Sequence, residues 1–165
     1  MKENIKKTPT IIGFREWIAF PELGLSALKA KVDTGAKTSS LHAFDIKLVK
    51  RGGVTYVKFK VHPIQKNTDH VVECSSLLVD RRVVTDSGGH KENRYVINVV
   101  ILMGSVKKTI QLTLTNRASM KYRMLLGREA LNQFYIDPSQ SYLLRKSQKQ
   151  KIYLKELKQT SLADD

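Results

Sequence analysis

The chain has 165 residues, 41% of them hydrophobic and 7% aromatic, and this length suits a single hydrophobic core. The formal net charge is +14, from 29 Lys and Arg against 15 Asp and Glu, and because no fold requires such an excess it bears on the partners of the protein. The single cysteine, Cys74, excludes an intrachain disulfide framework and favours a reducing compartment.

The hydrophobic pattern predicts many strands and few helices. Period-two alternation and β-branched residues indicate strands, in chain order, at Thr10 to Gly13, Trp17 to Phe20, Ser26 to Val32, Ala43 to Val49, Val54 to Val61, Val71 to Val79, Arg82 to Thr85, Arg94 to Leu102, Lys107 to Thr115 and Lys121 to Leu126. Turn residues predict hairpins at Arg51-Gly52-Gly53, Ser87-Gly88-Gly89 and Gly104-Ser105. With one short helix from Arg128 to Phe134, we expect an all-β, closed or partly open barrel.

The end of the chain differs in composition from the rest. After Pro138 it becomes polar and basic, while Ile152, Leu154 and Leu157 have the spacing of an amphipathic turn. The pattern leaves open whether this tail is a loose helix or is disordered.

The tetrad Asp33-Thr34-Gly35-Ala36 directly follows a predicted strand. An aspartic peptidase needs a carboxylate at a sharp turn, a hydroxyl that ties down the loop and a glycine that lets backbone approach closely. Asp, Thr and Gly are also ordinary turn residues, so the tetrad alone fits a strand-ending turn without chemistry. A second element, Met124 to Leu131, runs from a buried apolar strand through Gly127 into a helix-like stretch.

With these two motifs in this order, the chain resembles a retropepsin-like family labelled "ATP-dependent zinc protease". That family is associated with RimK-type glutamate ligases, which add glutamate to ribosomal protein tails. Further segments that carry the resemblance are Leu41-His42-Ala43, Val84 to Gly88, Leu112 to Arg117 and Asp137-Pro138-Ser139. The resemblance covers residues 10–145 and implies a retropepsin-like domain there, with 1–9 as an N-terminal extension and 146–165 as a basic C-terminal tail.

The resemblance implies an aspartic endopeptidase that works as a homodimer. One catalytic loop per chain and no internal repeat require a symmetric pair, in which two Asp33 carboxylates meet at the axis. Two such carboxylates share a proton and titrate as a unit, one acting as base and the other as acid on the attacking water. Thr34 holds the loop and Gly35 leaves room for substrate backbone, so the catalytic residues implied are Asp33, Thr34 and Gly35.

The resemblance also implies a substrate-binding set of Ala36, Lys37, Gly88 and Arg128. Many retropepsins have an acidic residue where this chain has Lys37; a basic residue there favours an acidic substrate, although a solvated loop lysine fits equally. A Gly-containing hairpin covers the substrate in retropepsins, and Gly88 belongs to one candidate for this flap. Arg51-Gly52-Gly53 is the other candidate, and the sequence does not choose between them.

The family label raises zinc and ATP as cofactors. Neither is predicted, because His42, His62, His70 and His90 lie far apart and Cys74 has no neighbouring ligand at zinc-finger spacing. The segment 35–38 lacks both the upstream glycine and the Gly-Lys pair of a P-loop. A Ser-Lys pair of Ser39 or Ser40 with Lys37 lacks an oxyanion motif. We therefore expect no metal and no cofactor.

Two classes of function remain. The first is a dimeric aspartic peptidase acting on acidic, glutamate-rich protein tails, which the positive charge suits. The second is a catalytically silent binding module that regulates a RimK-type glutamate ligase or docks on a ribosomal protein. The spread aromatic residues give no RNA-binding signature, so nucleic acid is not favoured.

Because the N-terminus lacks an apolar signal-like segment and the longest apolar run, Val96 to Met103, is too short to span a bilayer, we expect a cytoplasmic protein without membrane contact.

Overall fold

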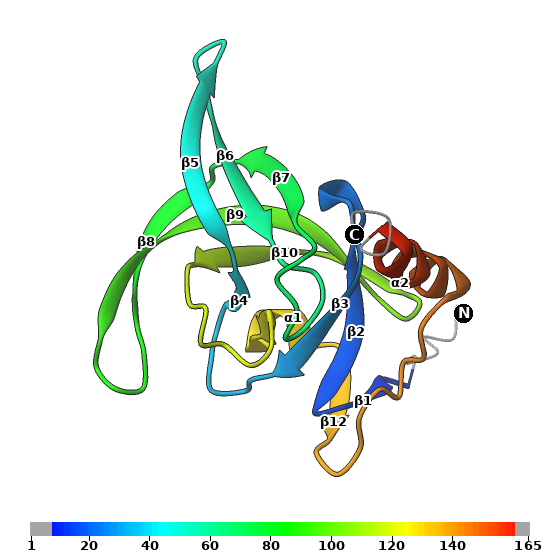
Figure 1. Ribbon diagram of the computed structural model, residues 1–165. Helices are drawn as coiled ribbons and strands as arrows, with labels where there is room; N and C mark the ends of the chain where they lie inside the picture. The colour runs from blue at the N-terminus through cyan, green and yellow to red at the C-terminus, as the bar shows by residue number, and fades with distance from the viewer. Residues whose placement is uncertain (1–7, 161–165) are drawn as a thin grey trace, which may run out of the picture.

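Six strands close into a barrel in the computed structural model, which describes residues 8–160 (Figure 1). Around the ring, each strand hydrogen-bonded to the next, these are β10 (Val106–Thr115), β4 (Ser39–His42), β11 (Met124–Leu126), β3 (Leu25–Val32), β2 (Arg15–Phe20) and β9 (Lys91–Met103), which pairs again with β10. A further strand, β8 (Asp80–Thr85), pairs with β9 outside the ring. The all-β barrel expected from the sequence is confirmed.

The barrel consists of two halves with matching connections. The β2–β3 hairpin of one half corresponds to the β9–β10 hairpin of the other, and both are antiparallel. Strand β3 then pairs in parallel with β11, β10 pairs in parallel with β4, and β4 and β11 pair antiparallel between them. The loops that leave β3 and β10, residues 33–38 and 116–123, therefore occupy equivalent positions in the two halves.

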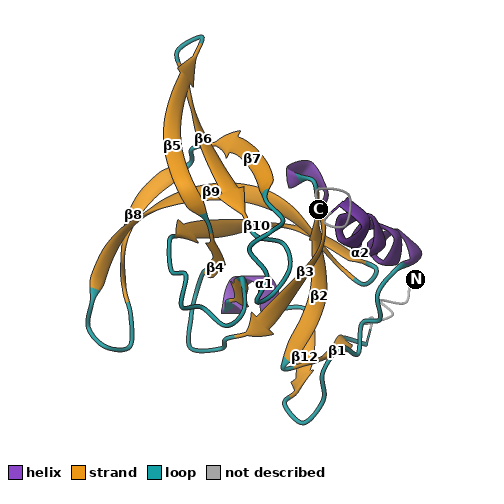
Figure 2. Cartoon of the chain, in the orientation of Figure 1, coloured by secondary structure: helices purple, strands orange, loops and turns teal. Residues whose placement is uncertain are grey.

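Two smaller sheets and two α-helices accompany the barrel (Figure 2). The first sheet contains β5 (Phe44–Arg51), β6 (Val54–Val61) and β7 (Val72–Leu77), and the second pairs β1 (Thr10–Gly13) with β12 (Phe134–Asp137) in parallel. A 3-10 turn, η1 (Pro21–Leu23), joins β2 to β3, α1 (Arg128–Leu131) follows β11, and α2 (Gln148–Thr160) packs beside β3. All three expected hairpins form, and Gly52 and Gly53 both have positive φ, at 56° and 79°, as a tight hairpin turn requires.

The core follows from the alternation along the strands. Large side chains that are less than 2% exposed fill the interior: Phe20, Phe59, Ile12, Ile18, Leu25, Leu28, Leu41, Ile97, Ile101, Met103, Leu112 and Met124. Burying each such side chain stabilises the fold by roughly 1.5–3 kcal/mol relative to leaving it exposed.

A buried carboxylate ties the chain beyond β12 to the barrel. Glu16 on β2 is fully buried and accepts hydrogen bonds from the backbone N–H groups of Gly13 (2.7 Å), Leu143 (3.1 Å) and Leu144 (2.8 Å). These three donors satisfy the charge and hold β1 and the segment leading to α2 against β2.

Two expectations about individual elements were wrong, and strands β4 and β12 were missed. The helix from Arg128 ends at Leu131 instead of Phe134, because Phe134 starts β12 and pairs with Thr10 of β1. Strand β4 was not predicted because Ser39-Ser40-Leu41-His42 has no strong β propensity, yet β10 and β11 pair with it on both sides. The strand expected from Lys121 begins only at Met124.

The tail, left open by the sequence, is helical over residues 148–160. Ser147 and Gln150 form a capping box: the Ser147 hydroxyl accepts from the Gln150 N–H (3.1 Å) and the Gln150 side-chain oxygen accepts from the Ser147 N–H (2.9 Å). Residues 1–7 of the predicted extension and residues 161–165 of the predicted tail lie outside the described residues.

Candidate active site

Asp33 stands directly after β3 in a loop that orients its side chain. The Asp33 carboxylate accepts a hydrogen bond from the Gly35 N–H (3.0 Å), and the Asp33 carbonyl accepts one from the Ala36 N–H (3.3 Å). Asp33 is half-buried, whereas Thr34 and Gly35 are exposed. The loop therefore presents a fixed carboxylate on one side and open backbone on the other.

The start of α1 braces this loop. The N–H of Asp33 donates to the Leu126 carbonyl (2.9 Å), and the N–H of Arg128 donates to the Ala36 carbonyl (2.8 Å). The Arg128 guanidinium also donates to the Thr34 carbonyl (3.0 Å). Because the first N–H groups of a helix have no partner within the helix, α1 can satisfy loop carbonyls at no cost to its own hydrogen bonds.

Gly127 allows the loop and α1 to approach this closely. Its N–H donates to the Ser39 hydroxyl (3.0 Å), and a Cβ at this position would lie 2.7 Å from the Thr38 carbonyl carbon and 2.9 Å from the Lys37 oxygen. The segment Leu125-Leu126-Gly127 thus lies against the Asp33 loop.

A partly buried polar chain connects this region to β9. The Ser39 carbonyl accepts from the Thr113 hydroxyl (3.3 Å), which accepts from the Arg94 guanidinium (3.5 Å). The carboxylate of Glu92 pairs with Arg94 (3.0 Å) and accepts from the Thr115 hydroxyl (3.0 Å). Sequence analysis did not identify these residues. A charged residue at the start of a predicted strand, Arg94, is ordinary in sequence, and only the structure shows that its side chain is 8% exposed.

The hairpin that carries Gly88 is joined to the loop 116–123. At its tip, the Asp86 carboxylate accepts from the N–H groups of Gly88 and His90, both at 2.9 Å, and from the Arg117 guanidinium at 3.3 Å. The His90 N–H, and with smaller effect the Gly88 N–H and the charges of His90 and Arg117, lower the pKa of Asp86. The Arg117 N–H in turn donates to Nδ1 of His42 (3.0 Å).

The structure brings most of the expected site residues together. Asp33, Thr34, Gly35, Ala36, Lys37 and Arg128 form one unit of loop and helix. Within this unit Lys37 is exposed and lies 3.9 Å from the Glu129 carboxylate.

Gly88 lies apart from that unit, on the β8–β9 hairpin. The tip of the other flap candidate, between β5 and β6, lies at the end of the molecule opposite the loop that follows β3 (Figure 1). The β8–β9 hairpin is linked through Asp86, Arg117 and His42 to β4, the strand that the Asp33 loop enters.

Within residues 8–160, no group of three or more His, Cys, Asp or Glu side chains is placed to hold a metal ion, and the expectation of metal independence stays a prediction.

Cys74 is buried, and burial raises the pKa of its thiol to about 12. No helix in the described part of the chain is long and apolar enough to cross a membrane.

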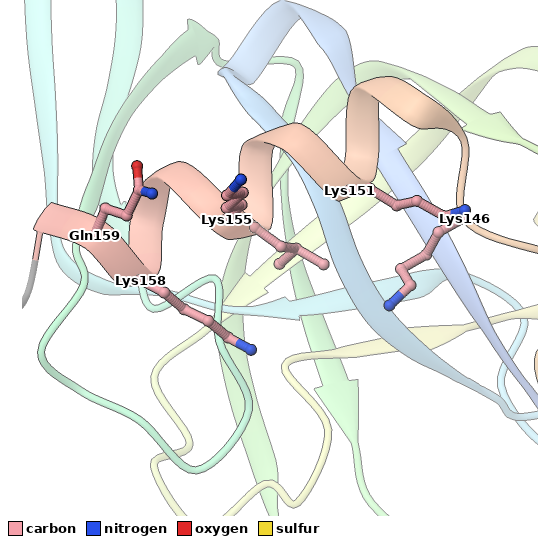
Figure 3. Close-up of a pocket in the computed structure, with 6 residues that line it drawn as sticks. Lys146, Lys151, Lys155, Lys158 and Gln159 are labelled. Atoms are coloured by element: carbon pink, nitrogen blue, oxygen red, sulfur yellow. The ribbon is translucent and has the colours of Figure 1, made fainter.

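A basic depression lies along α2, away from the loop of Asp33. It has a volume of about 330 Å³ and is lined by Leu154 and Gln159 and by four lysines (Figure 3): Lys146, Lys151, Lys155 and Lys158.

Comparison with protein families gives one match that spans most of the chain. Residues 11–147 match the family described as RimB-like, retropepsin-like aspartic endopeptidase RimB. A solved structure from Legionella pneumophila, of a protein of unknown function, aligns with a TM-score of 0.70 at 28% identity, over 84% of this chain and all of that one.

The curated relatives are longer proteins. One from Shewanella pealeana, named a probable alpha-L-glutamate ligase, is 53% identical over 135 residues, which cover 81% of this chain and 30% of the relative. One of the same name from Desulfotalea psychrophila is 43% identical over 160 residues, which cover 94% of this chain and 34% of the relative. The chain thus spans about a third of the length of the curated relatives it matches.

Proposed function

Because this chain belongs to the RimB-like family of retropepsin-like aspartic endopeptidases, we propose that it is an aspartic peptidase with Asp33 as its catalytic carboxylate. The observation that carries the proposal is the loop of Asp33. Its carboxylate is oriented by Gly35, its backbone is braced by Leu126 and Arg128, and its outer face is exposed. This bracing holds the carboxylate in one orientation, as a catalytic group requires.

In the proposed mechanism, two chains pair so that the two Asp33 carboxylates lie together. The ionised one takes a proton from a water molecule, whose oxygen attacks the peptide carbonyl, while the protonated one donates its proton to the carbonyl oxygen. Collapse of the tetrahedral intermediate breaks the C–N bond. The amine leaves with the proton of one carboxyl, while a hydroxyl of the intermediate returns its proton to the other carboxylate as the C=O bond re-forms, so that the pair again holds one proton. The exposed Thr34 and Gly35 would face the partner and the substrate backbone.

The β8–β9 hairpin is the flap in this proposal. Its tip is joined through Asp86 and Arg117 to the loop 116–123, which is the counterpart of the Asp33 loop in the second half of the barrel. Gly88 would approach the substrate backbone from this hairpin, and Ala36, Lys37 and Arg128 would flank it from the other side.

Acidic, glutamate-rich protein tails are the proposed substrates. The net charge of +14 favours an acidic chain, and related sequences occur as about a third of proteins named probable glutamate ligases. A peptidase for such tails would break peptide bonds of the kind that a glutamate ligase forms.

The same relatives favour one alternative, a catalytically silent module that docks a RimK-type ligase or a ribosomal protein. The basic depression along α2 is the surface that such a module would offer to an acidic partner (Figure 3). Binding through α2 would not depend on Asp33.

Cleavage mapping by mass spectrometry tests the proposal. Wild type, Asp33→Asn and the exposed-loop control Asp69→Asn are incubated with glutamate-tailed and glutamine-tailed peptides from acidic to neutral pH. We expect cuts in glutamate tails by wild type and Asp69→Asn, and none by Asp33→Asn with its fold intact. No cuts by wild type at any pH would favour the binding module.

A further inference from the structure

A second feature of the barrel, separate from the Asp33 loop, is a basic pocket beside the loop 116–123. It has a volume of about 370 Å³. Its ten lining residues include His42, Phe44, His62, Lys66, Lys121 and Arg123. None of these lining residues, in the part of the chain that the structure describes, is acidic; Asp69 belongs to the same loop as Lys66 but is not among them.

Arg123 is the informative member of this lining. It is only 6% exposed, its Nε is buried without a hydrogen-bond partner among the described residues, and one terminal nitrogen reaches only the Asn67 carbonyl, at 3.5 Å. A guanidinium stays charged at any ordinary pH, and buried charges in proteins are normally paired. Among the described residues, the buried guanidinium of Arg123 therefore has no anionic partner to compensate its charge.

His42 also lines this pocket. Its Nδ1 accepts the Arg117 N–H, so the neutral ring carries its proton on Nε2. His62 stacks on Phe44, with ring centres 4.4 Å apart, and its Nδ1 lies 3.2 Å from the His70 carbonyl, which fixes the ring in place. Exposed Lys66 and Lys121 add two cations to that of Arg123 in the lining of the pocket.

We propose that this pocket binds the side-chain carboxylate of an acidic residue in the substrate peptide, with Arg123 as its buried anchor. The inference rests on the proposed peptidase function and adds the residues that select the substrate. A planar carboxylate matches the fork of a guanidinium, and Lys66 and Lys121 attract it from solvent.

The position of the pocket suits a peptide that passes the Asp33 loop. Strand β4 starts at Ser39, beside that loop, and ends at His42 in the pocket. Three residues of strand at about 3.3 Å each give a separation of roughly 10 Å along β4. An extended peptide covers this distance with about three residues, so the pocket serves a side chain near the cleaved bond without touching the reacting atoms.

The test measures binding on the Asp33→Asn protein, which cannot consume the peptide. Isothermal titration calorimetry with tetraglutamate and tetraglutamine peptides should show tighter binding of tetraglutamate. Lys121→Ala should weaken tetraglutamate binding several-fold, and Arg123→Met should remove the preference for glutamate over glutamine. Methionine can fill the space of the arginine stem, so Arg123→Met should keep the fold.

Lys50→Ala, on the β5–β6 hairpin, is the matched control for a lost surface charge and should leave binding unchanged. Inorganic phosphate and glutarate, titrated alone, separate recognition of a carboxylate from attraction of any anion; phosphate binding as tight as glutarate would overturn the proposal. Equal affinity for both peptides, or equal losses in Lys50→Ala and Lys121→Ala, would also overturn it.

The binding and cleavage experiments fail independently. A glutamate preference that depends on Arg123, in a protein that cuts no peptide, would support the pocket and refute the peptidase. Cleavage by wild type that is unaffected by Lys121→Ala and Arg123→Met would support the peptidase and refute the pocket. Binding of a single-stranded RNA that depends on Lys121, without binding of tetraglutamate, would assign the pocket to another ligand.

Discussion

Replacing Gly127 by alanine tests whether the close contact between α1 and the Asp33 loop matters for activity. The new Cβ would lie 2.7 Å from the Thr38 carbonyl carbon, whereas non-bonded carbon atoms prefer roughly 3.5 Å. Both sides of this contact are backbone, so the loop must move by up to about 0.8 Å. Overpacking of this kind costs about 1–3 kcal/mol, which lowers Tm by roughly 4–8 °C for a mid-range cost in a chain of this length.

The loss of activity should exceed the loss of stability. A displacement near 1 Å at a catalytic group costs on the order of 100-fold in rate, so kcat/KM on a glutamate-tailed peptide should fall by about that factor well below Tm. Amide hydrogen exchange at residues 127–129 should also accelerate, because the hydrogen bonds that these N–H groups donate to Ser39, Ala36 and Lys37 lengthen.

Gly53→Ala is the matched control for this experiment. Gly53 has a φ of +79° and open space around a new Cβ, so alanine there costs roughly 1–2 kcal/mol of backbone strain without a clash. It lies on the β5–β6 hairpin, and its kcat/KM should match wild type. Wild-type kcat/KM in Gly127→Ala, or equal losses of activity in the two variants, would refute the reasoning.

Three further predictions follow from single side chains. Glu16→Gln should lower the free energy of unfolding by about 2–4 kcal/mol, because an amide replaces the buried carboxylate that accepts three N–H groups. Chemical denaturation measures this loss, and the exposed control Glu22→Gln should unfold like wild type. Burial, and to a smaller extent the charge of Arg123, lower the pKa of His42 below 6.5. Because the unfolded chain then binds this proton more readily than the folded chain, the stability of the fold should fall as the pH drops below 6.5. Tm of wild type should therefore decline more between about pH 7.5 and 5.5 than Tm of His42→Asn, and parallel curves would contradict this. Asp86→Ala removes the acceptor for two tip N–H groups and for Arg117, so KM should rise and hydrogen exchange at residues 86–90 should accelerate, and a flap role is wrong if only Tm changes.

The local features of this fold could be predicted from the sequence. Alternation marks long strands such as β9, and Gly52-Gly53 marks a hairpin, because each signal lies within the segment that it describes. The same holds for Ser147 and Gln150, whose S-x-x-Q spacing is typical of a capping box at a helix start.

Features that depend on distant partners could not be predicted. Strand β4 exists because β10 and β11 pair with it, although Ser39-Ser40-Leu41-His42 has no strong β propensity. Phe134-Tyr135-Ile136 does consist of β-forming residues, but the segment is short and its pairing with the distant β1 is not visible in the sequence. The partly buried chain of Arg94, Thr113 and Ser39 joins three strands that are far apart in sequence. The basic pocket likewise draws on three separate segments, so its five cationic or imidazole residues are scattered along the sequence: His42, His62, Lys66, Lys121 and Arg123.

The two equivalent loops of the barrel differ in their charged residues, and this difference bears on the need for a dimer. The loop 33–38 carries the carboxylate, whereas the loop 116–123 has no acidic residue and contains Arg117, Lys121 and Arg123. A second catalytic carboxylate must therefore come from another chain if the mechanism uses two.

Subunit mixing measures this directly. If both Asp33 residues of a dimer are needed, equal amounts of wild type and Asp33→Asn, allowed to exchange subunits, give wild-type pairs in only about one quarter of the dimers. The activity should then fall to about a quarter of that of the same total amount of wild type, instead of the half expected from independent sites. A result of one half after verified exchange would mean that each chain acts alone, and the shared-carboxylate mechanism would have to be abandoned.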